Sequence, residues 1–300
     1  MSTGNVEFQA PPGHSPRDLA SAYAACAQIM RESDKDRYLA SLYAPEATRN
    51  GLFALYTFSH EVARVREVVS EALPGEVRLQ WWRDVIEGSG HGAVQSHPVA
   101  AALLDTIEHC HLPRQALLDL IEARFFDLYD DPMPTLGDLE GYAGETSSAL
   151  VRLASLICAQ GADPGAAEAA AHAGVAYALT GLMRALPWHA SRGQLYLPKD
   201  VLDRYGVTRD DVVSGRGGPG LHHALAELRS VARGHLGKVR QLRGTIPAVI
   251  APAFLPVALV EGYLAQMERP GYDPLHSIIT LPPWRQHWTY WRQARRAMRD

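Results

Sequence analysis

The sequence predicts an all-α protein that folds as a single domain. Apolar residues recur at helical spacing along most of the chain, whereas the alternating β-branched runs that mark strands are close to absent. Hydrophobic residues make up 47% of the 300 residues and charged residues 21%, a composition with ample material for a core. No linker divides the chain, and no internal repeat is evident.

Proline and glycine divide the chain into roughly ten expected helical segments. Residues 1–16, rich in Gly, Pro and Ser, are expected to form a flexible tail. Residues 17–275 are expected to form the main domain, and residues 276–300 a C-terminal amphipathic helix rich in Trp and Arg. Thr135 is a candidate N-cap, because its side chain accepts a hydrogen bond from the first turn of a helix. The segment boundaries are expected at residues 45, 74–75, 88–92, 113, 132–134, 161–165, 215–220 and 270–274.

The clearest helical period begins at Leu221. Steps of three and four residues place a series of apolar side chains on one face, which predicts an amphipathic helix packed on the core. His235 lies on this face and is interpreted as a hydrogen-bonded core histidine rather than a ligand. The series comprises Leu221, Leu225, Leu228, Ala232, His235, Val239 and Leu242.

Charge, cysteine content and hydropathy exclude several classes of protein. The net charge of -4 gives no bulk electrostatic basis for binding nucleic acid. Cys26, Cys110 and Cys158 lie far apart without metal-ligand spacing and are expected to be free thiols. The apolar run 246–260 contains prolines and is shorter than the ~20 residues of a spanning helix. With no signal-peptide pattern, we expect a cytoplasmic protein, and peripheral contact with the inner membrane stays open.

Several motifs, in their order and spacing, suggest a family. Residues 78–84 read RLQWWRD, residues 192–198 read RGQLYLP, and residues 252–256 read PAFLP. Together they make residues 20–275 similar to the squalene/phytoene synthase family. The resemblance implies an isoprenoid-synthase-type helical bundle around a central cavity. Those enzymes join two isoprenoid diphosphates head to head, with magnesium bridging the diphosphates to D-x-x-x-D carboxylates on two facing helices.

The resemblance also indicates which residues stand at the positions of the two magnesium motifs. Only one of them is a carboxylate, and the neighbouring arginines oppose a cation rather than hold it. We therefore assign no catalytic residue, no metal ligand and no cofactor; magnesium is expected only if the chain is an active synthase. The degenerate motif positions are Ala63, Arg64 and Glu67 in the first segment and Ala185 and His189 in the second.

Longer stretches resemble a non-catalytic branch of the family. This branch includes the mitochondrial complex I assembly factor with a phytoene-synthase-like domain. The resemblance implies a pseudoenzyme that takes part in assembling the respiratory NADH:quinone oxidoreductase. Its expected partner is a protein, such as a complex I subunit or an assembly intermediate. The stretches are residues 127–150, 182–202 and 244–256.

Two alternatives from other functional classes remain open. One is a protein that binds an isoprenoid diphosphate or another lipid without metal, because arginine side chains suit phosphate oxygens. The other is a prenyltransferase that condenses farnesyl or geranylgeranyl diphosphate, which needs about three or four carboxylate oxygens in one cavity. The candidate substrate contacts are Tyr56, Arg64, Arg66, Glu67, Tyr142, Thr146, Arg184, His189, Arg192, Tyr196 and Lys199.

The C-terminal segment carries three tryptophans on one helical stripe, at Trp284, Trp288 and Trp291. Several arginines accompany them. Aromatic and basic residues at this spacing suit a membrane surface or the groove of a protein partner. The other interpretation is that the tryptophans pack onto the main domain.

Overall fold

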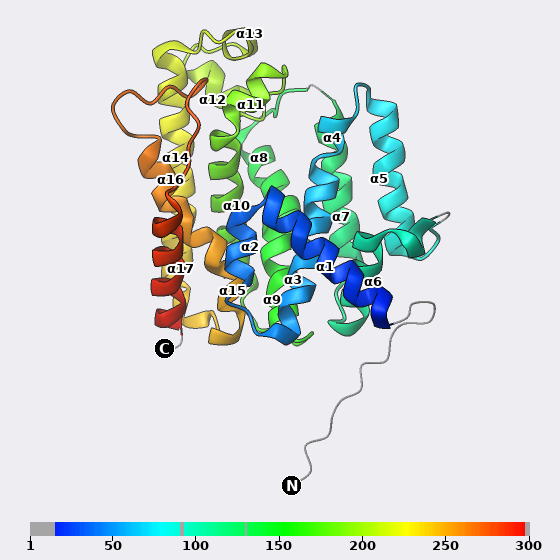
Figure 1. The fold of residues 1–300 in the computed structure, drawn as a ribbon. Coiled ribbons are helices and arrows are strands. Elements are labelled where there is room, and N and C mark those ends of the chain that lie inside the picture. The colour runs from blue at the N-terminus through cyan, green and yellow to red at the C-terminus, as the bar shows by residue number, and fades with distance from the viewer. Residues whose placement is uncertain (1–15, 91–92, 130, 298–300) are drawn as a thin grey trace.

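The computed structural model describes residues 16–90, 93–129 and 131–297, and over those ranges it contains helices and no strand. The all-α prediction is confirmed. Figure 1 shows the longer helices standing side by side. Helix α5 (Ala72–Glu87) lies at one edge of the molecule, and α14 (Gly218–Gln241) and α17 (Pro283–Ala297) lie at the other. Residues 1–15 of the expected tail lie outside the described residues, and Pro16 already belongs to a helix.

The N-terminal half of the chain builds one hydrophobic core. Its largest fully buried side chains include Phe58, Leu79 and Leu103. Cys26 and Cys158 are free and buried in this core, and Cys110 is free at its edge, as expected. Besides α5, the helices of this half are α1 (Pro16–Ser33), α2 (Lys35–Ser41), α3 (Glu46–Ala63), α4 (Val65–Val68), α6 (Pro98–His109), α7 (Arg114–Phe125) and α9 (Ala149–Cys158), with 3-10 turns at Ala93–Ser96 and Phe126–Leu128.

The C-terminal half builds a second core around α14 and α10 (Ala167–Arg184). Leu221, Leu225 and Leu228 are buried along α14, which confirms the predicted amphipathic helix. His235 lies at the edge of this core and bonds His172 at 2.9 Å and Glu140 at 3.0 Å, so it is a hydrogen-bonded histidine. The other helices are α8 (Leu136–Ala143), α11 (Leu186–Ser191), α12 (Lys199–Arg204), α13 (Arg209–Val213) and α16 (Val260–Gln266).

The two cores meet where α8 passes through a π-helical turn, η3 (Gly144–Ser148), into α9. Thr135 caps α8 as predicted, in a reciprocal pair of hydrogen bonds with Asp138. Helix α10 approaches η3 so closely that a Cβ on Gly174 would lie 2.2 Å from the Ser148 backbone. Because glycine has no Cβ, α10 and η3 can pack in direct contact at position 174.

The apolar stretch Ala248–Gln266 is the one described segment that is long and apolar enough to cross a membrane. It is broken into short turns and helices, and 56% of it is buried inside the protein. Core helices of soluble proteins pass the same test, so the segment is weak evidence for a span. Its elements are η5 (Ala248–Ile250), α15 (Ala251–Phe254), η6 (Leu255–Leu259) and α16, preceded by η4 (Arg243–Thr245).

Helix α17 packs on this stretch through Tyr290, which is fully buried. Its three tryptophans do not pack onto the domain. Trp284, Trp288 and Trp291 are 67%, 55% and 42% exposed. Of the two interpretations left open for this stripe, the structure supports a tryptophan face that points to the outside.

Candidate functional site

A largely buried arginine, Arg124, and a buried carboxylate, Asp127, lie near the π-helical turn where the two halves meet. Arg124, near the end of α7, donates to Asp127 at 3.0 Å and to the hydroxyl of Tyr142 at 2.6 Å. The Tyr142 hydroxyl donates in turn to Asp127 at 2.8 Å. Burial lowers the pKa of Arg124, but the negative charge on its partners outweighs this and raises it. Arg124 therefore stays charged inside the protein.

The second magnesium-motif segment closes over this group. His189 of α11 lies 4.7 Å from Tyr196 between ring centroids, and Tyr196 lies 6.2 Å from Tyr142. Burial, together with the charges of Arg124 and Arg192, lowers the pKa of His189 to about 4. His189 is therefore neutral at physiological pH.

A second arginine lies beside this group, between two aromatic rings. The guanidinium of Arg37 lies 5.3 Å from the ring centre of Tyr56 and 5.0 Å from that of Tyr177. Arg37 also pairs with Asp34 at 3.3 Å. Such placement over aromatic faces stabilises a cation where water is scarce. We call the whole set the arginine–tyrosine core: Arg37, Tyr56, Arg124, Asp127, Tyr142, Tyr177, His189 and Tyr196.

The end of α10 is held by a separate carboxylate, Asp36. Arg184 donates to Asp36 at 3.4 Å and lies 3.6 Å over the ring of Tyr263. Tyr263 donates to Asp36 at 2.6 Å, and Gln286 of α17 donates to it at 3.1 Å. The Tyr290 hydroxyl donates to the Asp36 carbonyl at 3.0 Å. This Asp36 cluster therefore fastens α17 to α2, α10 and α16.

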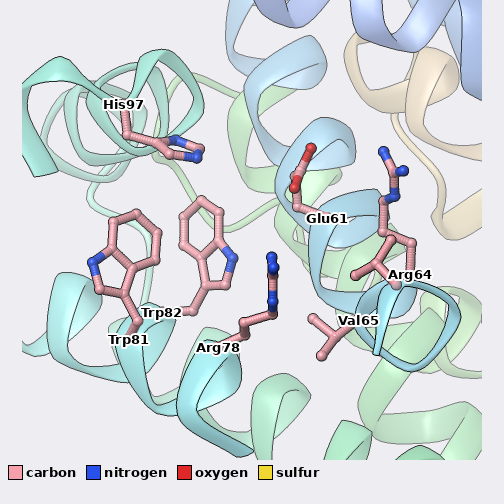
Figure 2. Close-up of a pocket in the computed structure, with 8 residues that line it drawn as sticks. Glu61, Arg64, Val65, Arg78, Trp81, Trp82 and His97 are labelled. Carbon is pink, nitrogen blue, oxygen red and sulfur yellow. The ribbon is translucent and has the colours of Figure 1, made fainter. Parts of the chain in front are cut away.

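The first magnesium-motif segment lies elsewhere, beside an open pocket of about 490 Å³. Figure 2 shows Trp81 and Trp82 side by side on α5, with His97 near their rings and Arg64 and Glu61 reaching in from the end of α3. Trp82 is buried, whereas Trp81 is half-buried. The imidazole of His97 accepts a hydrogen bond from the backbone N–H of Ala100, and burial lowers the pKa of this imidazole. We call this the aromatic pocket.

The structure divides the residues predicted as substrate contacts. Tyr56, Tyr142, His189 and Tyr196 come together in the arginine–tyrosine core, and Thr146 bonds the Tyr142 carbonyl at 2.6 Å. Arg192 and Arg66 lie close enough for their charges to act on His189 and Tyr196, whereas the remaining residues lie apart. Arg66 bonds the Val69 carbonyl at 3.3 Å, Arg64 and Glu67 are exposed, Arg184 joins the Asp36 cluster, Arg192 lies exposed over Trp188, and Lys199 pairs with Asp203.

Four central residues were not among the predicted substrate contacts. Arg37, Arg124, Asp127 and Tyr177 form half of the arginine–tyrosine core. Arg37 lies within residues 20–275, the range that resembles the family, but none of the motifs quoted for that resemblance includes it. Arg124 and Asp127 lie three residues apart at a helix end, a spacing that is usually a surface ion pair. Their burial depends on the packing of α8 and α11 over them.

The residues at the motif positions do not fit a magnesium ion. Ala63 and Ala185 offer no ligand, and the Glu67 carboxylate is exposed. Asp127 already accepts from Arg124 and Tyr142. Within residues 16–90, 93–129 and 131–297, no group of three or more His, Cys, Asp or Glu side chains is placed to hold a metal. This donor set therefore gives no basis for a magnesium-dependent step.

Comparison with known proteins places the chain among relatives of two kinds. A rat protein named NADH dehydrogenase (ubiquinone) complex I, assembly factor 6, is 30% identical over 279 residues, which are 92% of this chain and 84% of the relative. Its human counterpart is 30% identical over 273 residues, 90% of this chain and 82% of the relative. The 15-cis-phytoene synthase of Synechocystis sp. is 27% identical over 220 residues, 68% of this chain and 64% of the relative.

Solved structures share the fold. Squalene synthase HpnC from Alicyclobacillus acidocaldarius superposes with a TM-score of 0.72 at 24% identity, covering 87% of this chain and 98% of that one. A dehydrosqualene synthase in complex with ligand superposes with a TM-score of 0.79 at 17% identity, covering 95% and 99%. The sequence profile of the family described as Squalene/phytoene synthase matches residues 30–292. The chain therefore belongs to the squalene/phytoene synthase family.

Proposed function

We propose that the chain is a non-catalytic member of its family that binds a protein partner during assembly of respiratory complex I. The main observation behind the proposal is where the two magnesium-motif segments lie and which side chains they present. One ends at the surface with a single carboxylate at its motif positions, Glu67, and the other is built into the arginine–tyrosine core through His189. Neither segment gathers the oxygen ligands that a magnesium-dependent synthase requires.

The relatives support the assembly role over a synthase role. The proteins named complex I assembly factor 6 from rat and human align with 92% and 90% of the chain. The phytoene synthases of Synechocystis sp. and Arthrospira platensis align with 68% and 93% of it, at 27% and 24% identity against 30% for the assembly factors, so the support comes from identity rather than coverage. We therefore place the chain at the surface of the membrane that holds complex I, in contact with a subunit or an assembly intermediate.

The aromatic pocket and its surroundings are our candidate for the partner surface. Val68, Leu73 and Val77 are 45%, 68% and 63% exposed, and Val68 lines the pocket itself. Exposed apolar residues beside a concave aromatic wall are typical of a site that takes an apolar side chain from a partner. Arg64 and Arg78 at the rim favour a partner segment with nearby carboxylates.

The catalytic part of the proposal is tested with purified protein. The chain is incubated with farnesyl or geranylgeranyl diphosphate, with and without magnesium, and product formation and binding are followed together. We expect no product under either condition. Magnesium-dependent condensation would overturn the non-catalytic assignment.

The partner surface is tested in cells that lack the protein. The variant Leu73→Asp/Val77→Asp is expected to lower assembled complex I to the level of the deletion, while folding as the wild type does. Ile278→Asp is the matched control, because Ile278 is 85% exposed on a different part of the surface. A wild-type level of complex I with the double variant would reject this surface. A wild-type level of complex I in the deletion cells that carry only an empty vector would reject the assembly role itself.

A metal-free isoprenoid diphosphate-binding protein is the second candidate. One observation favours it: the Nε of Arg124 is buried and has no hydrogen-bond partner among the described residues. A phosphate oxygen satisfies such a donor. Arg64 is exposed, Arg184 pairs with Asp36 and Lys199 pairs with Asp203. This candidate therefore depends mainly on Arg124 and Arg37, with Arg192 and Arg66 near His189 and Tyr196.

Titration with geranylgeranyl diphosphate separates the two candidates. If the diphosphate binds at the arginine–tyrosine core, Arg124→Met is expected to weaken binding by about tenfold or more, because a charge-assisted hydrogen bond is lost. Arg64→Ala and Arg184→Ala are the controls and are expected to leave the affinity unchanged. No saturable binding by the wild type would eliminate this candidate.

A further inference from the structure

A second, larger pocket lies on the opposite edge of the molecule from the aromatic pocket (Figure 1). It has a volume of about 720 Å³ and runs between the end of α14, the stretch 243–258 and α17. Its apolar lining includes Leu236, Val239, Ile246, Phe254 and Val257. None of these residues belongs to the arginine–tyrosine core, so neither magnesium-motif segment explains the groove.

The rim of this groove is strongly basic. Arg240 and Arg243 line it from the end of α14, and Arg292 and Arg296 line it from α17. Glu261 is the single acidic residue in the lining. Its carboxylate lies 3.2 Å from Arg233 and 3.8 Å from Arg240, so it is already engaged by arginine. The groove therefore combines an apolar slot with an excess of positive charge at its edge.

The exposed tryptophans stand on the same helix as two of these arginines. Arg292 follows Trp288 by four residues and Trp291 by one, so it lies between the tryptophan stripe and the groove. The rings of Trp288 and Trp291 stack at 4.9 Å, and Arg295 lies 4.8 Å over Trp291. Tyr290, on the inner face, fixes how α17 is turned. The tryptophan stripe and the groove therefore lie next to each other on the surface of the protein.

We propose that this groove binds an anionic phospholipid of a bilayer surface. Arginine at the rim binds the phosphate of the headgroup through paired hydrogen bonds, and the apolar slot holds the first part of an acyl chain. The tryptophan stripe lies at the level of the headgroups, where indole rings are most stable. The proposal is independent of the identity of the protein partner.

Flotation with vesicles tests the proposal on the full chain. Vesicles of phosphatidylcholine alone are compared with vesicles in which a third of the lipid is phosphatidylglycerol. The wild type is expected to bind the anionic vesicles and to shift its tryptophan emission to shorter wavelength as the stripe leaves water. Equal binding to both vesicle types, or binding to neither, would overturn the proposal.

Matched variants show whether the groove is responsible. Arg292→Glu/Arg296→Glu is expected to weaken binding to anionic vesicles by about tenfold or more, because each basic group near the surface contributes to attraction. Arg64→Glu/Arg78→Glu changes the charge equally on the far edge and is the control (Figure 1). Equal loss in both pairs would mean that net charge, not the groove, causes binding, and would overturn the site.

A third variant tests the apolar slot without changing charge. Ala258 lines the groove, and Ala258→Phe fills part of the slot. We expect weaker binding to anionic vesicles with unchanged helicity by circular dichroism. Unchanged binding by this variant would contradict insertion of an acyl chain.

Discussion

The chain leaves α3 and α10 in different ways, although both helices end at the positions of a magnesium motif. After α3 it turns outward at Arg64, so that Arg64 and Glu67 are exposed beside the aromatic pocket. After α10 it turns inward, and His189 contacts Tyr196 in the arginine–tyrosine core. The first segment is therefore exposed to solvent, whereas the second packs in the arginine–tyrosine core.

The comparison teaches that two related sites need not change in the same way when their carboxylates are absent. At the end of α10, Arg184 is partly buried and pairs with the buried carboxylate of Asp36, which needs a positive partner. At the end of α3, water solvates Arg64, so no partner is needed. Changes at the two ends should therefore differ in their effect on stability.

The largest effect is expected at Asp36, which holds the end of α10 to α17. Asp36→Ala leaves Arg184, Tyr263 and Gln286 without their acceptor and should lower the free energy of unfolding by about 3 kcal/mol. Urea denaturation measures the change. Glu32→Ala, at an exposed position, is the control. If the two variants unfold at the same midpoint, the Asp36 cluster does not hold α17 in place.

An intermediate effect is expected from pH at His189. Its pKa is about 4 in the folded protein against an ordinary 6.5, so the unfolded chain binds the proton more readily. The stability contributed by neutral His189 is complete above about pH 6.5 and is lost as the pH falls toward 4. As the pH is lowered from 7.5 to 4.5, the urea concentration at which half of the protein is unfolded should fall less steeply for His189→Gln than for the wild type. His222→Gln, at an exposed site, should keep the wild-type slope, and equal slopes in all three would contradict the burial of His189.

The smallest effect is expected at the first motif segment. Arg64→Ala and Glu67→Ala should each change the free energy of unfolding by less than about 0.5 kcal/mol, because both side chains are exposed. Arg184→Ala should cost more than either by the same measurement. A large loss at Glu67 would mean that the segment folds back onto the protein and that the contrast with α10 is wrong.

Much of the fold followed from the sequence. Local signals act within a few residues, so the helical period of α14 and the cap at Thr135 were predictable. The family motifs predicted the helical bundle, because they specify packing that is shared across the family. Through the family resemblance, the sequence also predicts that the motif positions carry a single carboxylate, Glu67.

The tertiary structure decided where the charges lie. Locally, Arg124 and Asp127 look like a surface ion pair. Instead, Tyr142 of the nearby α8 bonds both of them, and His189 of α11, about 60 residues further along the chain, lies near Arg124. The exposure of the α17 tryptophans was also undecided, because a helical stripe of Trp suits a core and a surface equally. Tyr290 settles the orientation of α17 by bonding the Asp36 carbonyl, a contact between residues 254 positions apart. Sequence periodicity fixes which residues share a face, but long-range packing fixes which face is buried.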